Sequence, residues 1–471
     1  MNRILSGLGL LILLSCSAAD APEPESNIWI KGRLLGTLAD SVTLLDAYDF
    51  PVVSSHLDED NKFSLAFNAA SGAYYQLKYG DSAMPIYLSP QYDLILKINE
   101  QGKEADLEFE GRGKESNNYI LSFSEFESVN KPAYDQLLAK SESEFLIEAR
   151  RYRSKSEAFL RNYQEHHFNL DPNFIAKERA RILYAWANRL IHYPEAHIYY
   201  TGEDEFAVSD TYHDYKKTVN LDASELITLP EYQRFINAYL DAEANILQEK
   251  GDKRRRTLIR FDLSNQLISE PQVKDFAQFD ILKESLQTGL DESNKQILKS
   301  FMNSAQNGMM RAAIGDLVSR WEVLERGNQI PSLPAETIDA TPFDIASYRG
   351  KFIYLRFWTT WCQPCLNDTT QLRHLSETEG NEDLVIISIN LDQEKADWKA
   401  EMENRQTSAD IIHLKVAPED VDRVKESFMI HTLPRNILIG SDGRIIEPIA
   451  PPPGDPELEE LMKAYSIALN S

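Results

Sequence analysis

The sequence contains little cysteine and little positive charge. Three cysteines occur in 471 residues, so the chain has no disulfide framework of the kind found in small exported domains. Its formal charge is 49 − 74 = −25, which argues against nucleic-acid binding. We interpret the one dense basic run, Lys250–Arg256, as a solvated turn. Neither a glycine-rich phosphate loop nor an HExxH-type zinc spacing is present.

The overall composition is that of a folded protein. Hydrophobic residues make up 42% of the chain and charged residues 26%, which is sufficient for ordinary buried cores. At roughly 150 residues per domain, the length indicates about three domains.

The N-terminus has the features of an export signal. The start "MNR" is positive, and the apolar run Ile4–Leu14 is too short to cross a ~30 Å hydrocarbon core. This run ends in Leu13-Leu14-Ser15-Cys16, which resembles a bacterial lipoprotein box. The resemblance implies a signal peptide over residues 1–15 and a lipid on Cys16. The alternative is a simple secretory signal with an incidental cysteine.

The residues after Cys16 suggest where the protein is located. Residues 16–26 are interpreted as a tether, because Ser17–Ser26 is poor in apolar residues and contains prolines. Ser17 does not resemble an inner-membrane retention signal, so we expect a lipid-anchored, periplasm-facing envelope protein, with the outer membrane favoured over the inner.

Residues 27–114 predict a small antiparallel β-sandwich. Short apolar/polar alternations with period two are separated by turn-rich pieces such as "DEDNK". The pattern resembles the β module that often precedes thioredoxin-like domains in such lipoproteins. These residues offer no catalytic constellation.

Residues 115–325 predict a helical domain, because the apolar period changes. Tyr232, Phe235, Ile236, Tyr239 and Leu240 fall on one helical face, as do Ile314, Leu317, Val318, Trp321 and Leu324. The dense aromatic residues near Tyr184 and Trp186 are read as helix packing or as a binding groove. A helical repeat array stays open.

Residues 326–471 alternate strand and helix signals, and therefore predict an α/β domain. The segment Arg326–Glu336 is interpreted as a linker with two prolines. Buried strands are expected in "KFIYLRFW" and "LVIISINLD", and a hairpin turned by Asp442-Gly443 in "NILIGSDGRII". The chain as a whole is thus expected to be multidomain α+β.

A strand, a CxxC and then a helix place Cys362 at a helix N-terminus. Free backbone N–H groups there favour the thiolate, which is the attacking species in disulfide exchange. Cys362 is therefore assigned as the nucleophile and Cys365, one turn further, as the resolving thiol. Pro364 can occupy a first helical turn without losing a hydrogen bond. Trp361 is expected to shield one side of the sulfur, and Trp358 to pack beneath it.

No metal site or cofactor is expected at this pair. Zinc would require two further ligands, and no second CxxC or close pair of histidines is present. Isolated histidines such as His374 and His413 are read as surface or core residues.

A proline directly before a strand is a second feature of this domain, about seventy residues after the CxxC. In "HTLPRNILIG", Pro434 is a candidate cis peptide, because proline before a strand indicates a sharp turn.

The C-terminal third resembles the TlpA/ResA-like thiol-disulfide oxidoreductases of the thioredoxin superfamily. The resemblance rests on "RGKFIYLRFWTTWCQPC", "LVIISINLD" and "FMIHTLPRNILIGSDGRII". It implies that Pro434 faces the CxxC and that the Leu433 backbone pairs with a bound partner. Substrate contacts are expected from Trp361, Gln363, Pro364 and Leu433. Client proteins with disulfides and an upstream electron donor are the implied partners.

Two residues depart from the pattern of the family. Asp368 stands where ResA-like proteins carry an active-site Glu, and our hypothesis is that it tunes proton transfer. Arg356 stands where thioredoxins have a buried acid, and an inward-pointing guanidinium would lower the thiol pKa values. The alternatives are a helix first-turn residue for Asp368 and a surface or ion-paired strand residue for Arg356.

Two other functions compete with this reading. A peroxiredoxin-type peroxidase would have a proline where Leu355 stands, although Thr359 fits its threonine position. A ligand- or partner-binding lipoprotein would use the thioredoxin-like domain as a non-catalytic scaffold. We favour an oxidoreductase acting as a reductant, although Gln363-Pro364 does not fix the redox potential.

Overall fold

The computed structural model describes residues 26–36, 39–99, 106–377, 383–404 and 410–469. The chain divides into two compact units, which we describe separately. The first spans Met1–Val219 with Glu225–Ala238, and the second spans Asn220–Ser224 with Tyr239–Ser471. The helices between residues 115 and 325 are therefore divided between the two units.

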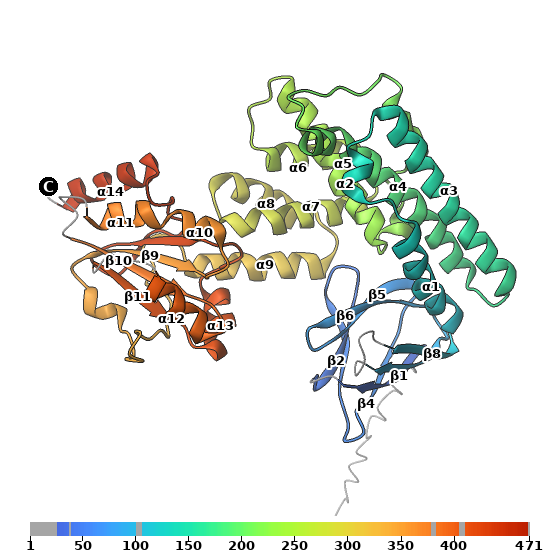
Figure 1. The fold of residues 1–471 in the computed structure, drawn as a ribbon, viewed down its shortest axis with the longest axis horizontal. Coiled ribbons are helices and arrows are strands. Elements are labelled where there is room, and N and C mark those ends of the chain that lie inside the picture. Colours follow the sequence, from blue (N-terminus) through green and yellow to red (C-terminus); the bar gives the residue numbers. More distant parts are fainter. Residues whose placement is uncertain (1–25, 37–38, 100–105, 378–382, 405–409, 470–471) are drawn as a thin grey trace, which may run out of the picture. The chain divides into compact units, whose positions relative to one another are not determined.

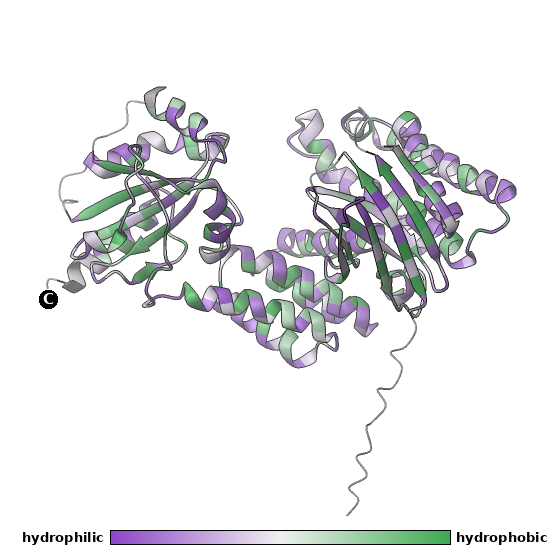
Figure 2. Cartoon of the chain, turned by 90° about the horizontal axis from the view of Figure 1, so that it is seen from below, coloured by the Kyte–Doolittle hydropathy of each residue, from purple (hydrophilic) through white to green (hydrophobic). Residues whose placement is uncertain are grey.

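The first unit begins with eight strands in two four-stranded sheets, ordered β4-β1-β7-β8 and β3-β2-β5-β6. Figure 1 draws these strands mainly in blue. The strands are β1 Ile28–Leu35, β2 Ser41–Leu45, β3 Pro51–His56, β4 Lys62–Phe67, β5 Ala73–Tyr79, β6 Ser82–Leu88, β7 Asp93–Asn99 and β8 Asp106–Arg112. Alternate residues along these strands are hydrophilic and hydrophobic (Figure 2). The inward residues of both sheets share one core, which includes Ile30, Leu65, Leu96, Leu44, Leu77 and Ile86.

The prediction of a purely antiparallel domain is wrong at one strand pair. β1 and β7 run parallel, with Ile30 opposite Leu94. The chain passes through the second sheet between these two strands, and a period-two pattern carries no information on strand direction.

Nine α-helices follow within the described residues. They are α1 Lys114–Asn130, α2 Tyr134–Leu138, α3 Glu142–His166, α4 Pro172–Thr201, α5 Pro230–Glu249, α6 Arg256–Leu267, α7 Pro271–Ser285, α8 Glu292–Ser304 and α9 Gly308–Val323. Tyr184 and Trp186 are buried, as helix packing requires, whereas Tyr199 is exposed. The basic run from Lys250 forms the turn before α6, where Arg254 pairs with Asp252.

The second unit contains a five-stranded sheet ordered β11-β10-β9-β12-β13. Its elements are β9 Phe352–Trp358, α10 Gln363–Asn367, α11 Thr369–Glu377, β10 Leu384–Asn390, α12 Lys395–Asn404, β11 Ile411–Lys415, α13 Val421–Ser427, β12 Arg435–Ile439, β13 Ile445–Glu447 and α14 Pro456–Leu469. The 3₁₀ turns of the chain are η1 Tyr212–Thr218, η2 Ser224–Leu226, η3 Leu286–Thr288, η4 Ile345–Tyr348 and η5 Pro418–Asp420.

β9 lies in the middle of this sheet, parallel to β10 and antiparallel to β12. Leu372 of α11 and Leu458 of α14 belong to one core cluster with Tyr354 of β9, so these helices cover one face of the sheet (Figure 1). Phe428, at the end of α13, packs on Phe357 on the other side. Because helices cover both faces, β9 is buried along almost its whole length.

The segment predicted as a linker is ordered against the sheet. The N–H of Gly327 donates to the Ile445 carbonyl (2.8 Å), and Ile445 donates back to Asn328 (2.9 Å). Further along, Glu336 exchanges two backbone hydrogen bonds with Lys415, each 2.9 Å. The interpretation as a linker is therefore wrong, because the prolines of this segment leave enough N–H groups free to pair with the outer strands β13 and β11.

Candidate active site

The CxxC lies where β9 leaves the sheet. Cys362 is the N-cap of α10, and its Sγ accepts the N–H of Cys365 at 3.2 Å. Pro364 occupies the first turn, where its missing N–H leaves no bond unmade. The Gln363 side chain is exposed and donates to Asn367 one turn later at 3.0 Å. The strand–CxxC–helix arrangement is thus present.

The two cysteines form a disulfide, with their Cα atoms 5.2 Å apart. Cys362 is 4% exposed and Cys365 2%. The assignment of Cys362 as nucleophile predicts a sulfur that solvent can reach, and this prediction is not met in the disulfide form, in which both cysteines are buried.

Buried apolar side chains cover the disulfide. Trp358 and Trp398 form a cluster with both cysteines, and Leu433 packs against it. Trp358 thus lies against the pair, as expected. Trp361 is 75% exposed, so its ring projects into solvent beside the pair, and most of the cover comes from the other three side chains.

The loop before β12 lies against the same cluster. The Leu433–Pro434 peptide bond is cis, and Leu433 contacts the buried group that holds both cysteines. The structure therefore brings together Cys362, Cys365, Leu433 and Pro434, although about seventy residues separate the two segments in sequence.

Arg356 points inward beneath the CxxC helix. The residue is 2% exposed, and its Nη2 donates to the Cys365 carbonyl at 2.6 Å. The same nitrogen lies 3.6 Å from Asp368 Oδ2, and the Asp368 side chain is 27% exposed. Arg356 therefore points inward, as the first hypothesis predicts, and is also ion-paired, as the alternative predicts. Asp368 is the C-cap of α10 and directly precedes α11, where its carbonyl accepts the Leu372 N–H at 2.9 Å, so it lies at the start of α11 and outside the first turn of the CxxC helix.

Sequence reasoning missed a buried polar group at the end of β10. The Asp392 carboxylate accepts the backbone N–H of Thr360, two residues before Cys362, at 3.0 and 3.2 Å. Asn390 and Lys415, both buried, adjoin Asp392. The available signal was an acid two residues after the end of the buried strand "LVIISIN", a place where side chains of parallel sheets reach a shared edge.

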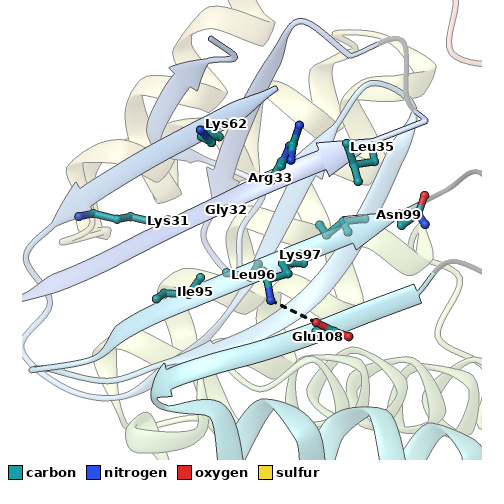
Figure 3. A pocket seen from close by; sticks show the side chains of 11 residues that line it. Lys31, Gly32, Arg33, Leu35, Lys62, Ile95, Leu96, Lys97, Asn99 and Glu108 are labelled. Carbon is teal, nitrogen blue, oxygen red and sulfur yellow. Dashed lines mark hydrogen bonds and ion pairs between the residues drawn. The ribbon is translucent and has the colours of Figure 1, made fainter. Parts of the chain in front are cut away.

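Other parts of the structure offer less redox chemistry. A pocket of about 490 Å³ on the first sheet is lined by four cations, Lys31, Arg33, Lys62 and Lys97, with Glu108, and it contains no thiol (Figure 3). Among the described residues, no three His, Cys, Asp or Glu side chains gather as a metal would require.

None of the described helices is both long and apolar enough to span a bilayer. Cys16 lies outside the described residues.

Comparison with known proteins matches the part of the chain that carries this site. The Redoxin family matches residues 325–462. The thiol-disulfide oxidoreductase ResA of Bacillus cereus (strain ATCC 10987 / NRS 248) is 25% identical over 145 residues, covering 31% of this chain and 81% of the relative. ResA of Bacillus subtilis (strain 168) is 21% identical over 127 residues, covering 27% and 68% respectively.

Two solved structures are also similar. The thioredoxin domain of a thiol-disulfide oxidoreductase from Bacteroides vulgatus is 20% identical, covers 30% of this chain and 98% of its own, and gives a TM-score of 0.28. A thioredoxin-like protein from Bacteroides caccae ATCC 43185 is 11% identical, covers 58% and 92%, and gives a TM-score of 0.34. The Redoxin match and the ResA relatives, without these structures, assign residues 325–462 of this chain to the thioredoxin superfamily, in the TlpA/ResA-like group of thiol-disulfide oxidoreductases.

Proposed function

We propose that this protein is an envelope thiol-disulfide oxidoreductase that reduces disulfides in client proteins. The observation that carries the proposal is a disulfide-forming CxxC at a helix start, packed against Leu433 before a cis proline. The exposed Trp361 next to this pair offers a contact surface for a client, which a purely structural disulfide would not need.

The reaction begins with the reduced pair. The Cys362 thiolate attacks one sulfur of a client disulfide, which forms a mixed disulfide and releases the other client sulfur as a thiolate. Cys365 then loses its proton and attacks Cys362 Sγ, which forms the Cys362–Cys365 disulfide and releases the second client thiolate. Two electrons pass from the pair to the client, and an upstream donor dithiol returns the pair to its reduced form.

The neighbouring residues have supporting roles in this proposal. The Leu433 backbone pairs with the client chain, and the exposed Trp361, Gln363 and Pro364 form the contact surface around Cys362. Asp368, partly exposed and one turn from Cys365, exchanges the proton of the resolving thiol with solvent.

We further propose an organisation for the whole chain. It comprises a signal peptide over 1–15, a tether over 16–26 lipidated at Cys16, a β-sandwich over 27–114, a helical domain over 115–325 and the thioredoxin-like domain over 326–471. Such an anchor would hold the protein at the periplasmic face of the envelope, with the outer membrane preferred.

Two experiments test the proposed reaction. The wild-type protein should accelerate the reduction of insulin by dithiothreitol, and Cys362→Ser should abolish that acceleration. In an envelope extract, Cys365→Ser should retain clients on Cys362 as mixed disulfides that dithiothreitol releases. The matched control is Cys362→Ser/Cys365→Ser, which should capture none. A wild-type protein that does not accelerate insulin reduction, together with a Cys365→Ser variant that captures no client, would contradict the proposal.

A further inference from the structure

The loop that presents Trp361 and Cys362 is held from below by a buried carboxylate. Asp392 is 5% exposed, and both of its oxygens lie within 3.2 Å of the Thr360 N–H. The adjacent backbone bond from Leu391 N–H to the Trp358 carbonyl (2.9 Å) fixes the start of the same loop. The end of β10 is thus a cradle for residues 358–360.

Asp392 is itself fixed by side chains that have no other evident task. Asn390 is fully buried, and its Nδ2 donates to Asp392 Oδ2 at 2.7 Å while its Oδ1 accepts the Asp392 N–H at 3.0 Å. Lys415 of β11 is 1% exposed and donates to the Asp392 carbonyl oxygen. Burial lowers the pKa of Lys415, and the Asp392 charge acts in the opposite direction.

This arrangement is costly for fold stability alone. Burying a carboxylate and an ammonium costs several kcal/mol, which their mutual attraction repays only in part. Together, Asn390 and Lys415 hold the Asp392 carboxylate rigidly as the acceptor for the Thr360 N–H, two residues before Cys362. A hydrogen bond to a charged acceptor is stronger than a neutral one and restricts the loop accordingly.

We propose that Asp392 is a positioning residue that holds the loop carrying Trp361 and Cys362 in the orientation needed to engage a protein client. This inference rests on the proposed function. The acid does not touch the reacting sulfurs, so its effect should depend on substrate size. A folded or extended client must dock against the exposed Trp361, whereas a small disulfide needs only the sulfur of Cys362.

The test compares two substrates across three variants of the full chain. Asp392→Ala should lower kcat/KM for insulin about tenfold, the cost of one charged hydrogen bond, and change the rate with oxidised glutathione less than about twofold. Asp392→Asn should recover most of the insulin activity, because its Oδ1 can still accept the Thr360 N–H. Thr360→Ala should match the wild type, because the donor is a backbone group.

A second measurement does not depend on any variant folding. Hydrogen exchange of peptides covering residues 358–362 in the oxidised wild-type protein should show a protected Thr360 amide. Rapid exchange there, or an equal loss of activity toward both substrates in a folded Asp392→Ala protein, would overturn the proposal. A wild-type protein that reduces no insulin but protects this amide would contradict the proposed function and leave the loop anchor intact.

Discussion

At the residue scale, Arg356 is the feature that most affects the chemistry of the thiols. A guanidinium beneath the pair favours thiolate, and therefore stabilises the reduced form and makes the protein more oxidising. That effect alone would make the cysteine pair a weaker reductant. The Asp368 carboxylate lies close to this guanidinium, with its Oδ2 3.6 Å from Arg356 Nη2. Its negative charge offsets part of the positive charge of Arg356. We infer that the balance between these two residues adjusts the potential of the pair.

This balance predicts opposite effects of two substitutions. Arg356→Met removes the cation and should raise the pKa of the Cys362 thiol by about one unit, since a nearby opposite charge shifts a pKa by ~1–3 units. Asp368→Asn unmasks the cation and should lower that pKa. Titration of thiolate absorbance in the reduced proteins measures both values, with Gln363→Ala as a neighbouring exposed control. Shifts of the same sign, or none, would contradict the inferred balance.

At the element scale, most strands of the fold could be predicted because their apolar periods are clear. The sequence of β3 shows no clear apolar alternation, since its residues are largely exposed and it pairs only with β2 at a sheet edge. The sequence does not predict to which face of the sheet the Arg356 side chain of β9 points. The reason is that a strand buried on both faces has no polar face in its sequence pattern. The sequence could point to Asp392 but could not predict its contact with Thr360. The donor of that hydrogen bond is a backbone N–H, and the two residues lie 32 positions apart.

The edge strand β11 contains a histidine that makes stability depend on pH. Both ring nitrogens of His413 lack a hydrogen-bond partner among the described residues. Burial lowers its pKa to about 4 from an ordinary value of 6.5. The unfolded chain therefore binds this proton more readily than the folded one, so the contribution of neutral His413 is complete above pH 6.5 and decreases as the pH falls toward 4.

The largest expected loss is about 3–4 kcal/mol, at 1.36 kcal/mol per unit of the pKa difference between about 4 and 6.5. Urea unfolding of the second unit at several pH values between 7 and 4 measures it. His413→Leu should remove this part of the pH dependence, whereas His374→Leu, on a different element, should retain it. Identical pH profiles for the wild type and His413→Leu would show that the imidazole is not the cause.

At the scale of the whole second unit, the helices are joined to the strand that follows the cis proline. Trp321 of α9 is 2% exposed, and its Nε1 donates to the Leu286 carbonyl at 2.6 Å. The Arg435 guanidinium lies over the Trp321 ring, 5.4 Å from its centre, and burial lowers the pKa of Arg435 to about 10. The α9 helix is therefore part of the packing that supports the active-site loop.

Trp321→Ala should accordingly destabilise the second unit by about 3–5 kcal/mol, the usual cost of deleting a buried tryptophan. It should also slow insulin reduction, because Arg435 directly follows Pro434. Met309→Ala on the same helix, at a residue 58% exposed, should change stability by less than about 0.5 kcal/mol. Urea unfolding measures both variants. An unchanged unfolding midpoint in Trp321→Ala would mean that α9 and the sheet are not coupled.

At the scale of the whole chain, a net charge of −25 gives no general attraction to an anionic membrane surface, so the proposed lipid on Cys16 would have to hold the protein in place. Cys16→Ala should therefore move the protein from the membrane fraction to the soluble fraction. Insulin reduction should stay unchanged, because Cys362 and Cys365 are the other two cysteines of the chain. Cys365→Ser serves as the matched control, since it should lose turnover and remain in the membrane fraction. If Cys16→Ala stayed with the membrane, another segment would have to anchor the chain, and the interpretation of residues 13–16 as a lipidation signal would be wrong.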